Sequence, residues 1–323
     1  MRPTNETAFL RQNMTQASNA RSLIRRTKPV GHFVGYGHPT FIRNMQYHLT
    51  TLDAYSDGAV DIWGFLDLDL FTEKLRTGWV WPSPPNGERI SVHSLGQWTS
   101  CEGQWTETID SMHRKVIEAV HELNPQEQNL LNMEGSDTEM KGKVRYAKLG
   151  LSDREPCRQA NGDGLIIGRE VPVFAVNGVK HVLTRLFIFS DGLCRIGYDG
   201  SLQQRDTVIE MFSSGRLVTS VPDGCRITVE GLGSSTCAKG YWYVDPDERV
   251  REIIALHDEL NGANDPVREC LLRKRSYLDD PTKTNLEALR FAYLAVPEHL
   301  RLYCGDMDSK DSEIRKILRE DEG

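Results

Sequence analysis

The sequence has little that would hold a metal ion or a disulfide framework, and it has no long apolar run. Its seven cysteines are odd in number, lie scattered through 323 residues and include no C-x-x-C pair. A disulfide-stapled fold and a zinc knuckle are therefore poorly supported. No apolar stretch approaches the length that spans a bilayer, and the first residues lack the apolar core of a secretory signal. These features predict a soluble cytoplasmic protein with reduced thiols.

Motifs with a specific mechanistic spacing are also missing. The sequence contains no G-x-x-x-x-G-K-[ST] phosphate loop, no H-E-x-x-H and no G-x-S-x-G, and no G-x-G-x-x-G joins a strand to a helix. Their absence removes the easily recognised enzyme classes and leaves other catalysis open. The net charge of -7 gives no general attraction for nucleic acid, although residues 1–30 hold six Lys or Arg against one Glu.

What the chain does contain is an internal repeat. Residues 85–96 read PNGERISVHSLG, and residues 222–233 read PDGCRITVEGLG. At this offset of 137, 16 of the 40 positions from 85 to 124 are identical without a gap. Ordinary composition would give about two or three identities by chance. Upstream the offset is 134, so the chain carries one domain-sized module twice.

Local patterns predict the same order of elements in each module: a strand hairpin, a strand, a helix, a second hairpin and a final helix. Asn-Gly or Asp-Gly between apolar runs indicates hairpin turns, expected at 177–178, 86–87 and 223–224. Helical spacing of apolar residues indicates helices at 68–76, 202–212, 108–123 and 246–260. Strands joined by tight turns predict an antiparallel sheet with helices on one face.

The expected fold class is α+β: a tandem duplication of an antiparallel-sheet-plus-two-helices module, with a helical C-terminal tail. Residues 5–27 have a weak apolar stripe that predicts a basic terminal helix, either docked or in contact with nucleic acid or a membrane surface. The expected parts are a basic N-terminal extension (1–31), repeat 1 (32–124), a linker with a short strand (125–164), repeat 2 (165–262) and a helical C-terminal segment (263–323).

Polar side chains in the repeated block are candidates for a ligand site. Strand alternation places Arg89 and His93 on one face, and it places Arg226 and Glu230 at the matching positions of repeat 2. If the modules pair about a pseudo-twofold axis through this face, His93 and Glu230 approach one another between two arginines. Such a site could hold an anionic ligand, with His93 as acid or base. The alternative is an ordinary solvated sheet face.

Tryptophans crowd the first repeat. Trp79 and Trp81 share a face by strand alternation and, like Trp98, have no counterpart in repeat 2. Such residues serve either the core or a partner surface. Trp105 and Trp242 occupy the same position in both repeats, so they are expected to serve a common core.

Two further sets of residues raise the question of a metal site. Six histidines precede residue 125, but no pair of them has convincing ligand spacing beside a carboxylate. Acidic residues near the C-terminus depart from the calcium-loop pattern and fit helix capping better. No metal site is therefore assigned. The histidines are His32, His38, His48, His93, His113 and His121, and the acidic residues are Asp306, Asp308, Asp311 and Glu313.

The function expected from these observations is that of a cytosolic binding or regulatory protein. It would recognise a small-molecule ligand or a protein partner at the junction of two pseudo-symmetric modules. The alternative is a hydrolase or transferase that uses His93 with a carboxylate in the cleft between them. Catalytic residues and cofactors are not assigned. The expected ligand-binding residues are Arg89, His93, Arg226, Glu230, Trp79 and Trp81.

Overall fold

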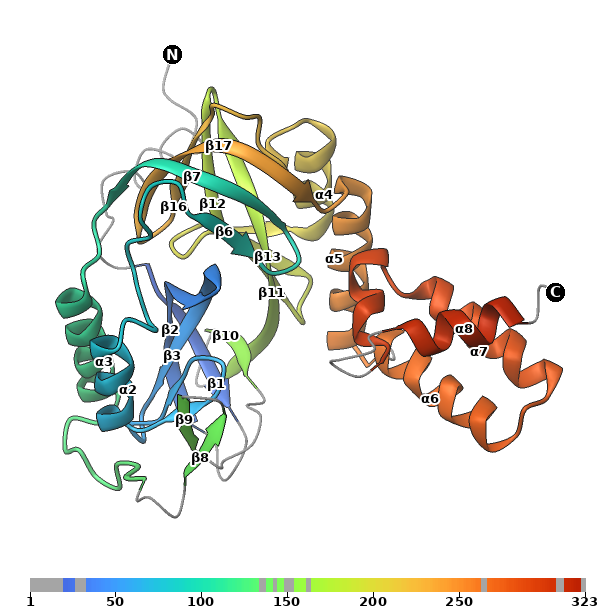
Figure 1. The fold of residues 1–323 in the computed structure, drawn as a ribbon, viewed down its shortest axis with the longest axis horizontal. Helices are drawn as coiled ribbons and strands as arrows, with labels where there is room; N and C mark the ends of the chain where they lie inside the picture. The colour runs from blue at the N-terminus through green and yellow to red at the C-terminus, as the bar shows by residue number, and fades with distance from the viewer. Residues whose placement is uncertain are drawn as a thin grey trace. The chain divides into compact units, whose positions relative to one another are not determined.

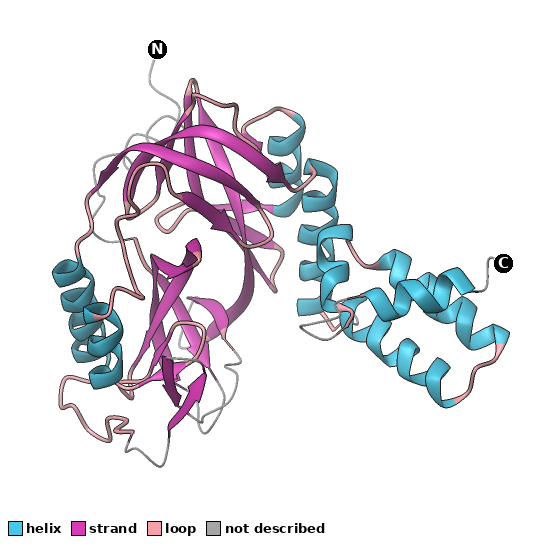
Figure 2. Cartoon of the chain, in the orientation of Figure 1, coloured by secondary structure: helices cyan, strands magenta, loops and turns pink. Residues whose placement is uncertain are grey.

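The computed structural model describes residues 20–26, 33–133, 138–141, 144–147, 154–160, 164–262, 266–305 and 311–320. These residues fall into two compact units, Met1–Tyr243 and Val244–Gly323. The first unit combines strands with helices, and the second consists of helices and their connections (Figure 1, Figure 2). None of the helices in the described residues has both the length and the apolar character needed to cross a bilayer.

Ten strands of the first unit pair edge to edge in a closed ring. Each repeat, taken together with the one strand that precedes its predicted bounds, supplies five neighbouring strands. The ring runs β1, β2, β3, β6, β7, β17, β16, β12, β11, β10 and back to β1. Repeat 1 supplies β1 (Ser22–Arg26), β2 (Phe33–Asn44), β3 (Gln46–Tyr55), β6 (Arg89–Val92) and β7 (Gly96–Trp105). Repeat 2 supplies β10 (Glu155–Gln159), β11 (Leu165–Asn177), β12 (Lys180–Phe189), β16 (Arg226–Val229) and β17 (Gly233–Tyr243).

The two repeats use the same strand pairings in the same register. β3 runs parallel to β6 with Tyr47 opposite Ile90, and β12 runs parallel to β16 with His181 opposite Ile227. These pairs are equivalent, because His181 occupies the repeat 2 position of Tyr47 and Ile227 occupies that of Ile90. The α+β composition and the duplication are therefore features of the fold as well as of the sequence.

The sheet is not antiparallel throughout, which corrects the prediction from tight turns. In each repeat the parallel strands are separated along the chain by a crossover that contains a helix, α2 (Leu68–Arg76) or α4 (Arg205–Ser213). Such a crossover returns the chain to the end at which the first strand began, so the next strand runs in the same direction. The turn signals predicted the β2–β3 and β11–β12 hairpins but carried no information about this crossover.

The repeats meet through their equivalent strands. β7 pairs antiparallel with β17, so that Gly96 lies opposite Tyr243 and Trp105 lies opposite Gly233. On the other side of the ring β1 pairs antiparallel with β10. Antiparallel pairing of like with like is the signature of a twofold axis, here an internal pseudo-twofold axis. Side chains from both repeats fill the ring: buried Trp98 packs edge-on against Phe174, with ring centroids 5.9 Å apart.

Three local predictions are corrected by the strands. The second hairpin turns at 93–95 and 230–232, because β6 and β16 begin only after the Asn-Gly and Asp-Gly turns. Residues 22–26 form a strand with every second side chain buried, where a helix was expected, and residues 5–19 lie outside the described residues. The stretch 153–164, assigned above to the linker between the repeats, contains β10.

Helices cover parts of the ring. α2 begins at the N-cap Asp67, whose side chain accepts a hydrogen bond from the backbone of Leu70, and α3 (Ile109–Leu123) begins with a capping box at Thr108. Both crossover helices end before a left-handed glycine, Gly78 or Gly215. Short strands complete the unit: β4 (Val60–Asp61), β5 (Phe65–Leu66), β8 (Thr138–Lys141), β9 (Val144–Ala147), β13 (Leu193–Ile196), β14 (Leu202–Gln204) and β15 (Leu217–Val218).

The second unit is built from helices around a core of its own. It contains α5 (Pro246–Leu260), α6 (Pro266–Asp279), α7 (Lys283–Ala295), the 3-10 helix η2 (Glu298–Tyr303) and α8 (Ser312–Glu320). α5, the last helix of repeat 2, is grouped with this unit and not with its own sheet. The core residues include Cys270, Leu286, Leu289, Val296, Cys304 and Ile314.

Candidate functional site

Arg89 and Arg226 lie on the exposed side of β6 and β16, on either flank of the β7–β17 pair. The Arg89 guanidinium lies 4.4 Å from the centroid of the Tyr241 ring, and Arg226 donates hydrogen bonds to the side chains of Gln104 and Ser234. Tyr241 and Gln104 occupy equivalent positions of the two repeats, as do Arg226 and Arg89. The two arginines therefore make equivalent contacts, each reaching across to the other repeat.

We call this surface the junction face: the exposed side of β6, β7, β17 and β16. The Tyr241 hydroxyl lies 3.0 Å from Thr99 Oγ1, and Lys239 Nζ lies 5.4 Å from the Tyr241 ring. The hydrogen bond with Thr99, with a further contribution from Arg89 and Lys239, holds the pKa of Tyr241 below its usual value. The polar residues of the face include Arg89, Thr99, Gln104, Arg226, Lys239 and Tyr241. They also include exposed Glu102, whose carboxylate accepts a hydrogen bond from Thr236.

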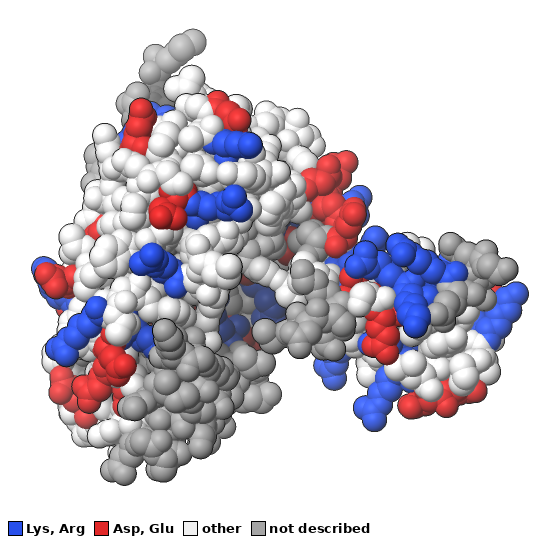
Figure 3. Space-filling model, viewed as in Figure 1, with Lys and Arg blue, Asp and Glu red and all other residues white. Residues whose placement is uncertain are grey.

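The junction face stays open among the described residues of its unit. There α3 packs against β2 and β3, and α4 packs against β13, β14 and β15. Tyr241 is 42% exposed. Lys or Arg side chains stand beside Asp or Glu side chains over the upper part of Figure 3, where β7 and β17 lie in Figure 1. Guanidinium groups on an open face can bind carboxylate or phosphate groups of a partner.

His93 and Glu230 are not brought together. Each follows the short strand of its hairpin, and the antiparallel β7–β17 pairing puts the two hairpin turns at opposite ends of these strands. Gly96, at the His93 turn, pairs with Tyr243, whereas Gly233, at the Glu230 turn, pairs with Trp105. His93 is exposed. The expected approach of the two side chains required the two hairpin turns to lie side by side, but the antiparallel pairing places them at opposite ends of β7 and β17.

Glu230 instead points into a small cavity inside the ring. Its carboxylate accepts hydrogen bonds from the Thr184 hydroxyl and from the backbone N–H of Tyr198, and burial raises its pKa. The cavity volume is about 10 Å³ for the centre of a water molecule, which is room for about one water. The lining includes two equivalent pairs, Pro39 with Pro172 and Leu49 with Leu183, as expected of a cavity at the pseudo-twofold axis.

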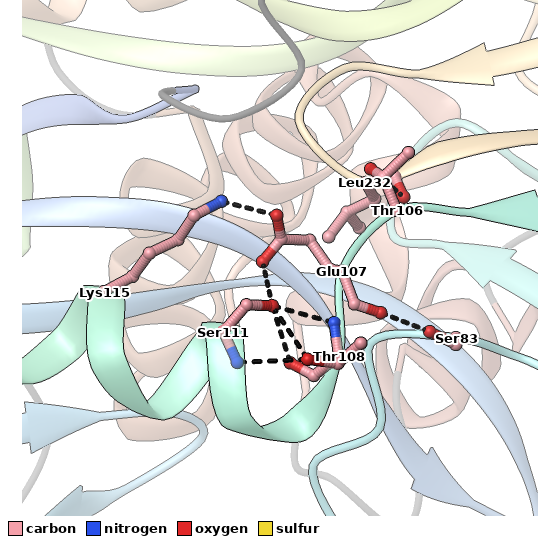
Figure 4. A network of polar contacts seen from close by, with 7 residues as sticks. All are labelled: Ser83, Thr106, Glu107, Thr108, Ser111, Lys115 and Leu232. Carbon is pink, nitrogen blue, oxygen red and sulfur yellow. Dashed lines mark hydrogen bonds and ion pairs between the residues drawn. The ribbon is translucent and has the colours of Figure 1, made fainter.

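The turn that carries Glu230 is held by repeat 1 (Figure 4). The backbone N–H of Thr106 donates to the carbonyl oxygen of Leu232 at 2.9 Å. The next residue, buried Glu107, forms a 2.7 Å ion pair with Lys115 and accepts a hydrogen bond from Ser111 in the first turns of α3. The start of α3 and the cavity wall of repeat 2 are thus tied to the same short segment.

A buried ion-pair network also joins the repeats. Arg154 bonds Asp53 of β3 at 2.6 Å and lies 3.4 Å from Glu170 of β11, and Glu170 lies 3.8 Å from Arg185 of β12. Burial raises the pKa of Asp53 to about 7. Burial opposes the charge of Arg154, but the neighbouring Asp53 and Glu170 carboxylates raise its pKa overall.

The sequence reading missed this network for a physical reason. Its members lie far apart along the chain, and Arg154 belongs to the stretch that was assigned to the linker between the repeats. One signal was present: Phe187 stands at the repeat 2 position of Asp53, and Thr51 stands at the repeat 1 position of Arg185. Where one repeat has a charged strand residue and the other has an apolar or neutral residue at the same position, the two positions have different surroundings in the fold.

Trp79 and Trp81 share a face, as alternation predicted, with buried Val80 between them on the other. They lie beside the end of β2, since Trp81 N–H donates to the Phe41 carbonyl oxygen. β2 and β3 therefore separate them from β6 and its Arg89. Trp79 is half-buried against the ring of Trp63, at 6.5 Å between centroids.

The shared tryptophans have different environments, which corrects the expectation of a common core. Trp105 packs edge-on against Phe41 at 5.3 Å and donates its indole N–H to the Pro84 carbonyl oxygen. Trp242 is 44% exposed. The difference follows from β17, whose register shifts against β7 at three places, the last immediately before Trp242. Trp98, in contrast, is fully buried inside the ring.

The histidines lie in unrelated surroundings. His38 is buried, and this burial lowers its pKa to about 3, while His113 stacks on Phe71 and His121 lies 3.7 Å from Glu127. In the part of the chain that the structure describes, no group of three His, Cys, Asp or Glu side chains could hold a metal ion. Asp311 accepts a hydrogen bond from the Tyr293 hydroxyl at 2.6 Å, and His32, Asp306 and Asp308 lie outside the described residues.

These features define a class: α+β proteins in which a duplicated module closes into one ring of strands. A family model described as a domain of unknown function, DUF7638, matches residues 30–127 and again residues 158–264. The chain therefore belongs to this family and carries its domain twice. A second model described as a domain of unknown function, DUF7639, matches residues 265–323. The search of curated proteins and the search of solved structures found no match.

Proposed function

We propose that this protein is a cytosolic binding or regulatory protein that recognises an anionic ligand, or an acidic segment of a protein partner, at the junction face. The observation that carries the proposal is the pair of equivalent contacts across the pseudo-twofold axis. Arg89 lies over Tyr241, and Arg226 bonds Gln104 and Ser234. These contacts hold two guanidinium groups in defined positions on an open surface, which reduces the conformational entropy that binding would otherwise cost.

Recognition fits the geometry better than the alternative of a hydrolase or transferase. An enzyme needs a concave site in which an acid or base meets the substrate. Exposed His93 and largely buried Glu230 sit at opposite ends of β7 and β17. The cavity beside Glu230 holds about one water molecule, which is too small for a substrate. The cytoplasmic location is proposed on the seven cysteines, all of which are reduced thiols in this structure.

A thermal-shift titration with inorganic phosphate and with hexaglutamate tests the proposal. Ligand that binds only the native state raises the melting temperature. We expect one of the two anions to raise it in the wild-type protein, and we expect Arg89→Ala/Arg226→Ala to weaken that binding by at least about tenfold, because each charged hydrogen bond contributes about 1.5–3 kcal/mol.

The matched control is Arg114→Ala/Arg275→Ala, which removes the same charge from two exposed positions on helices α3 and α6. The control should bind like the wild-type protein. If anion binding weakens equally in both double variants, the effect comes from the change in net charge alone, and the proposal is contradicted. So would the absence of any shift with either anion.

A further inference from the structure

Trp63 has a backbone conformation that suits glycine. Its φ is 62° and its side chain is 52% exposed. The residue at the same place in repeat 2 is Gly197, with φ of 78°. The left-handed turn is therefore common to both repeats, and only repeat 2 fills it with the residue that adopts it without steric cost.

Packing gives no sufficient reason for the tryptophan. A bulky residue in the left-handed region is strained, and such strain persists where the side chain has a use. Half of the Trp63 side chain faces solvent, so the strain is not offset by full burial. In repeat 2 a Cβ atom at Gly197 would come within 3.1 Å of the Glu230 carboxylate. Repeat 1 has exposed His93 at the position of Glu230, so this restriction does not apply there.

Trp63 is the centre of an aromatic cluster. Its ring lies 5.1 Å from His48 at an interplanar angle of 63° and 6.5 Å from Trp79 at 80°. Lys74 Nζ lies 4.8 Å from the Trp79 ring. The three rings meet edge to face, so they present an aromatic surface of several ring faces and edges. Proline-rich segments in a polyproline II helix dock on surfaces lined by aromatic side chains.

The chain itself shows how its tryptophans hold a proline-rich backbone. In the segment 82–85, which reads PSPP, the Trp81 indole N–H donates to the Ser83 carbonyl oxygen at 2.9 Å. The Trp105 indole N–H donates to the Pro84 carbonyl oxygen at 2.8 Å. Proline has no backbone N–H, so a proline-rich segment offers chiefly carbonyl oxygens for hydrogen bonding, and an indole N–H can donate to them.

The charge beside the cluster is positive. Arg43 is exposed, and its backbone N–H donates to the Trp79 carbonyl oxygen at 2.8 Å, which fixes it at the edge of the cluster. Lys74 is only 5% exposed, and burial lowers its pKa to about 8, so Arg43 is the cation that an occupant can reach. Fully exposed Met45 follows at the tip of the β2–β3 hairpin. Arg, Trp and Met are the residue types enriched at the centres of protein interfaces, and Arg43 favours an acidic residue in the occupant.

We propose that the Trp63 cluster (Arg43, Met45, His48, Trp63, Trp79) binds a proline-rich segment of a partner protein that carries an acidic residue beside its prolines. This site is separate from the junction face and stands on its own observation, the tryptophan that occupies a glycine conformation.

The test uses Trp63→Gly in the full-length chain, because glycine is the residue that repeat 2 has there. The probe is a decaproline peptide flanked by glutamates, and its binding is measured by tryptophan fluorescence and by calorimetry. We expect the wild-type protein to bind it and Trp63→Gly to bind about 30-fold more weakly, as for the loss of an interface anchor. The melting temperature should stay the same or rise, because the backbone strain is relieved.

Two controls separate this site from its alternatives. Trp242→Ala removes an exposed tryptophan elsewhere and should leave peptide binding unchanged, and the peptide with lysine flanks should bind more weakly than the one with glutamates. Absence of binding by the wild-type protein would overturn the proposal. A clear fall in the melting temperature of Trp63→Gly would overturn it too, by showing that Trp63 is structural. Binding of a thymidine oligonucleotide in place of the peptide would assign the cluster to base stacking.

Discussion

Asp53 is a buried residue whose ionisation couples stability to pH. It is fully buried on β3, bonded to Arg154, and burial raises its pKa from 3.8 to about 7. Arg154 favours the ionised form, but the burial contribution is larger. The folded protein thus holds this proton more tightly than the unfolded chain does. Asp53 belongs to repeat 1, and Arg154 precedes β10 of repeat 2, so the proton sits at the second seam between the repeats.

This predicts how stability depends on pH. A carboxyl group whose pKa is higher in the folded state contributes its full stability below the unfolded pKa near 3.8 and loses it as the pH rises through about 7. Urea unfolding of the wild-type protein at pH 5 and pH 8 should give a lower unfolding free energy at pH 8 from this group. Buried His38, whose pKa is lowered to about 3, changes stability in the opposite direction over this range, so the test is a comparison of two proteins. Between pH 5 and pH 8 the wild-type protein should lose more stability, or gain less, than Asp53→Asn does. Equal pH dependence in both proteins would contradict the assignment.

Close backbone contact between β7 and β17 explains why both repeats have the sequence Leu-Gly where these strands begin. A Cβ atom at Gly233 would lie 2.4 Å from the Gln104 carbonyl oxygen, and one at Gly96 would lie 2.8 Å from the Trp242 carbonyl oxygen. These glycines occupy equivalent positions. Each glycine lets β7 and β17 approach one another closely, so the glycine shared by the two repeats reflects the contact between them.

Substitution of one glycine tests the contact. Gly96→Ala places a methyl group against the Trp242 carbonyl oxygen, a backbone atom that cannot move independently of β17, so we expect a loss of about 2 kcal/mol or more. The matched control is Gly178→Ala in the β11–β12 turn, which has φ of 61° and open space around it. It should cost only about 1 kcal/mol, the cost of the left-handed conformation. Denaturant midpoints measure both, and equal losses would contradict the close approach.

Helices were predicted more closely than strand partners. α2 was expected at 68–76 and spans Leu68–Arg76, because its apolar spacing and its following glycine are local signals. β1 and β10 were missed, since each is short and is defined by pairing with a strand of the other repeat, far away in the sequence. The parallel β3–β6 pairing likewise depends on where the crossover leads, which no local pattern records.

At the scale of the whole molecule, the repeat predicted duplication and a pseudo-twofold axis but not closure. The candidate site was predicted in part for the same reason. Strand alternation placed Arg89 and Arg226 on an exposed face. The burial of Glu230, in contrast, depends on a hairpin turn that bends toward the cavity, which alternation does not predict. The network around Arg154 required knowledge of the β1–β10 seam. The sequence predicted which polar side chains share a strand face. It did not predict the long-range contacts that place those side chains on the surface or in the interior.

Two copies of one module close the ring of strands through antiparallel β7 and β17. Cys101 lies directly opposite Thr236 in this pairing, and both are partly exposed. Opposite residues of antiparallel strands have Cα atoms about 4.5–5.5 Å apart, within reach of a disulfide. Thr228 lies on the neighbouring strand β16, one strand further from β7.

The most direct measurement is therefore disulfide formation in Thr236→Cys under mild oxidation, mapped by peptide mass spectrometry, with Thr228→Cys as the control. The pairing predicts a disulfide between Cys101 and the new thiol at position 236, and none between Cys101 and a thiol at position 228. The β7–β17 pairing would be contradicted if the folded protein forms no disulfide from position 236, or forms one equally from position 228.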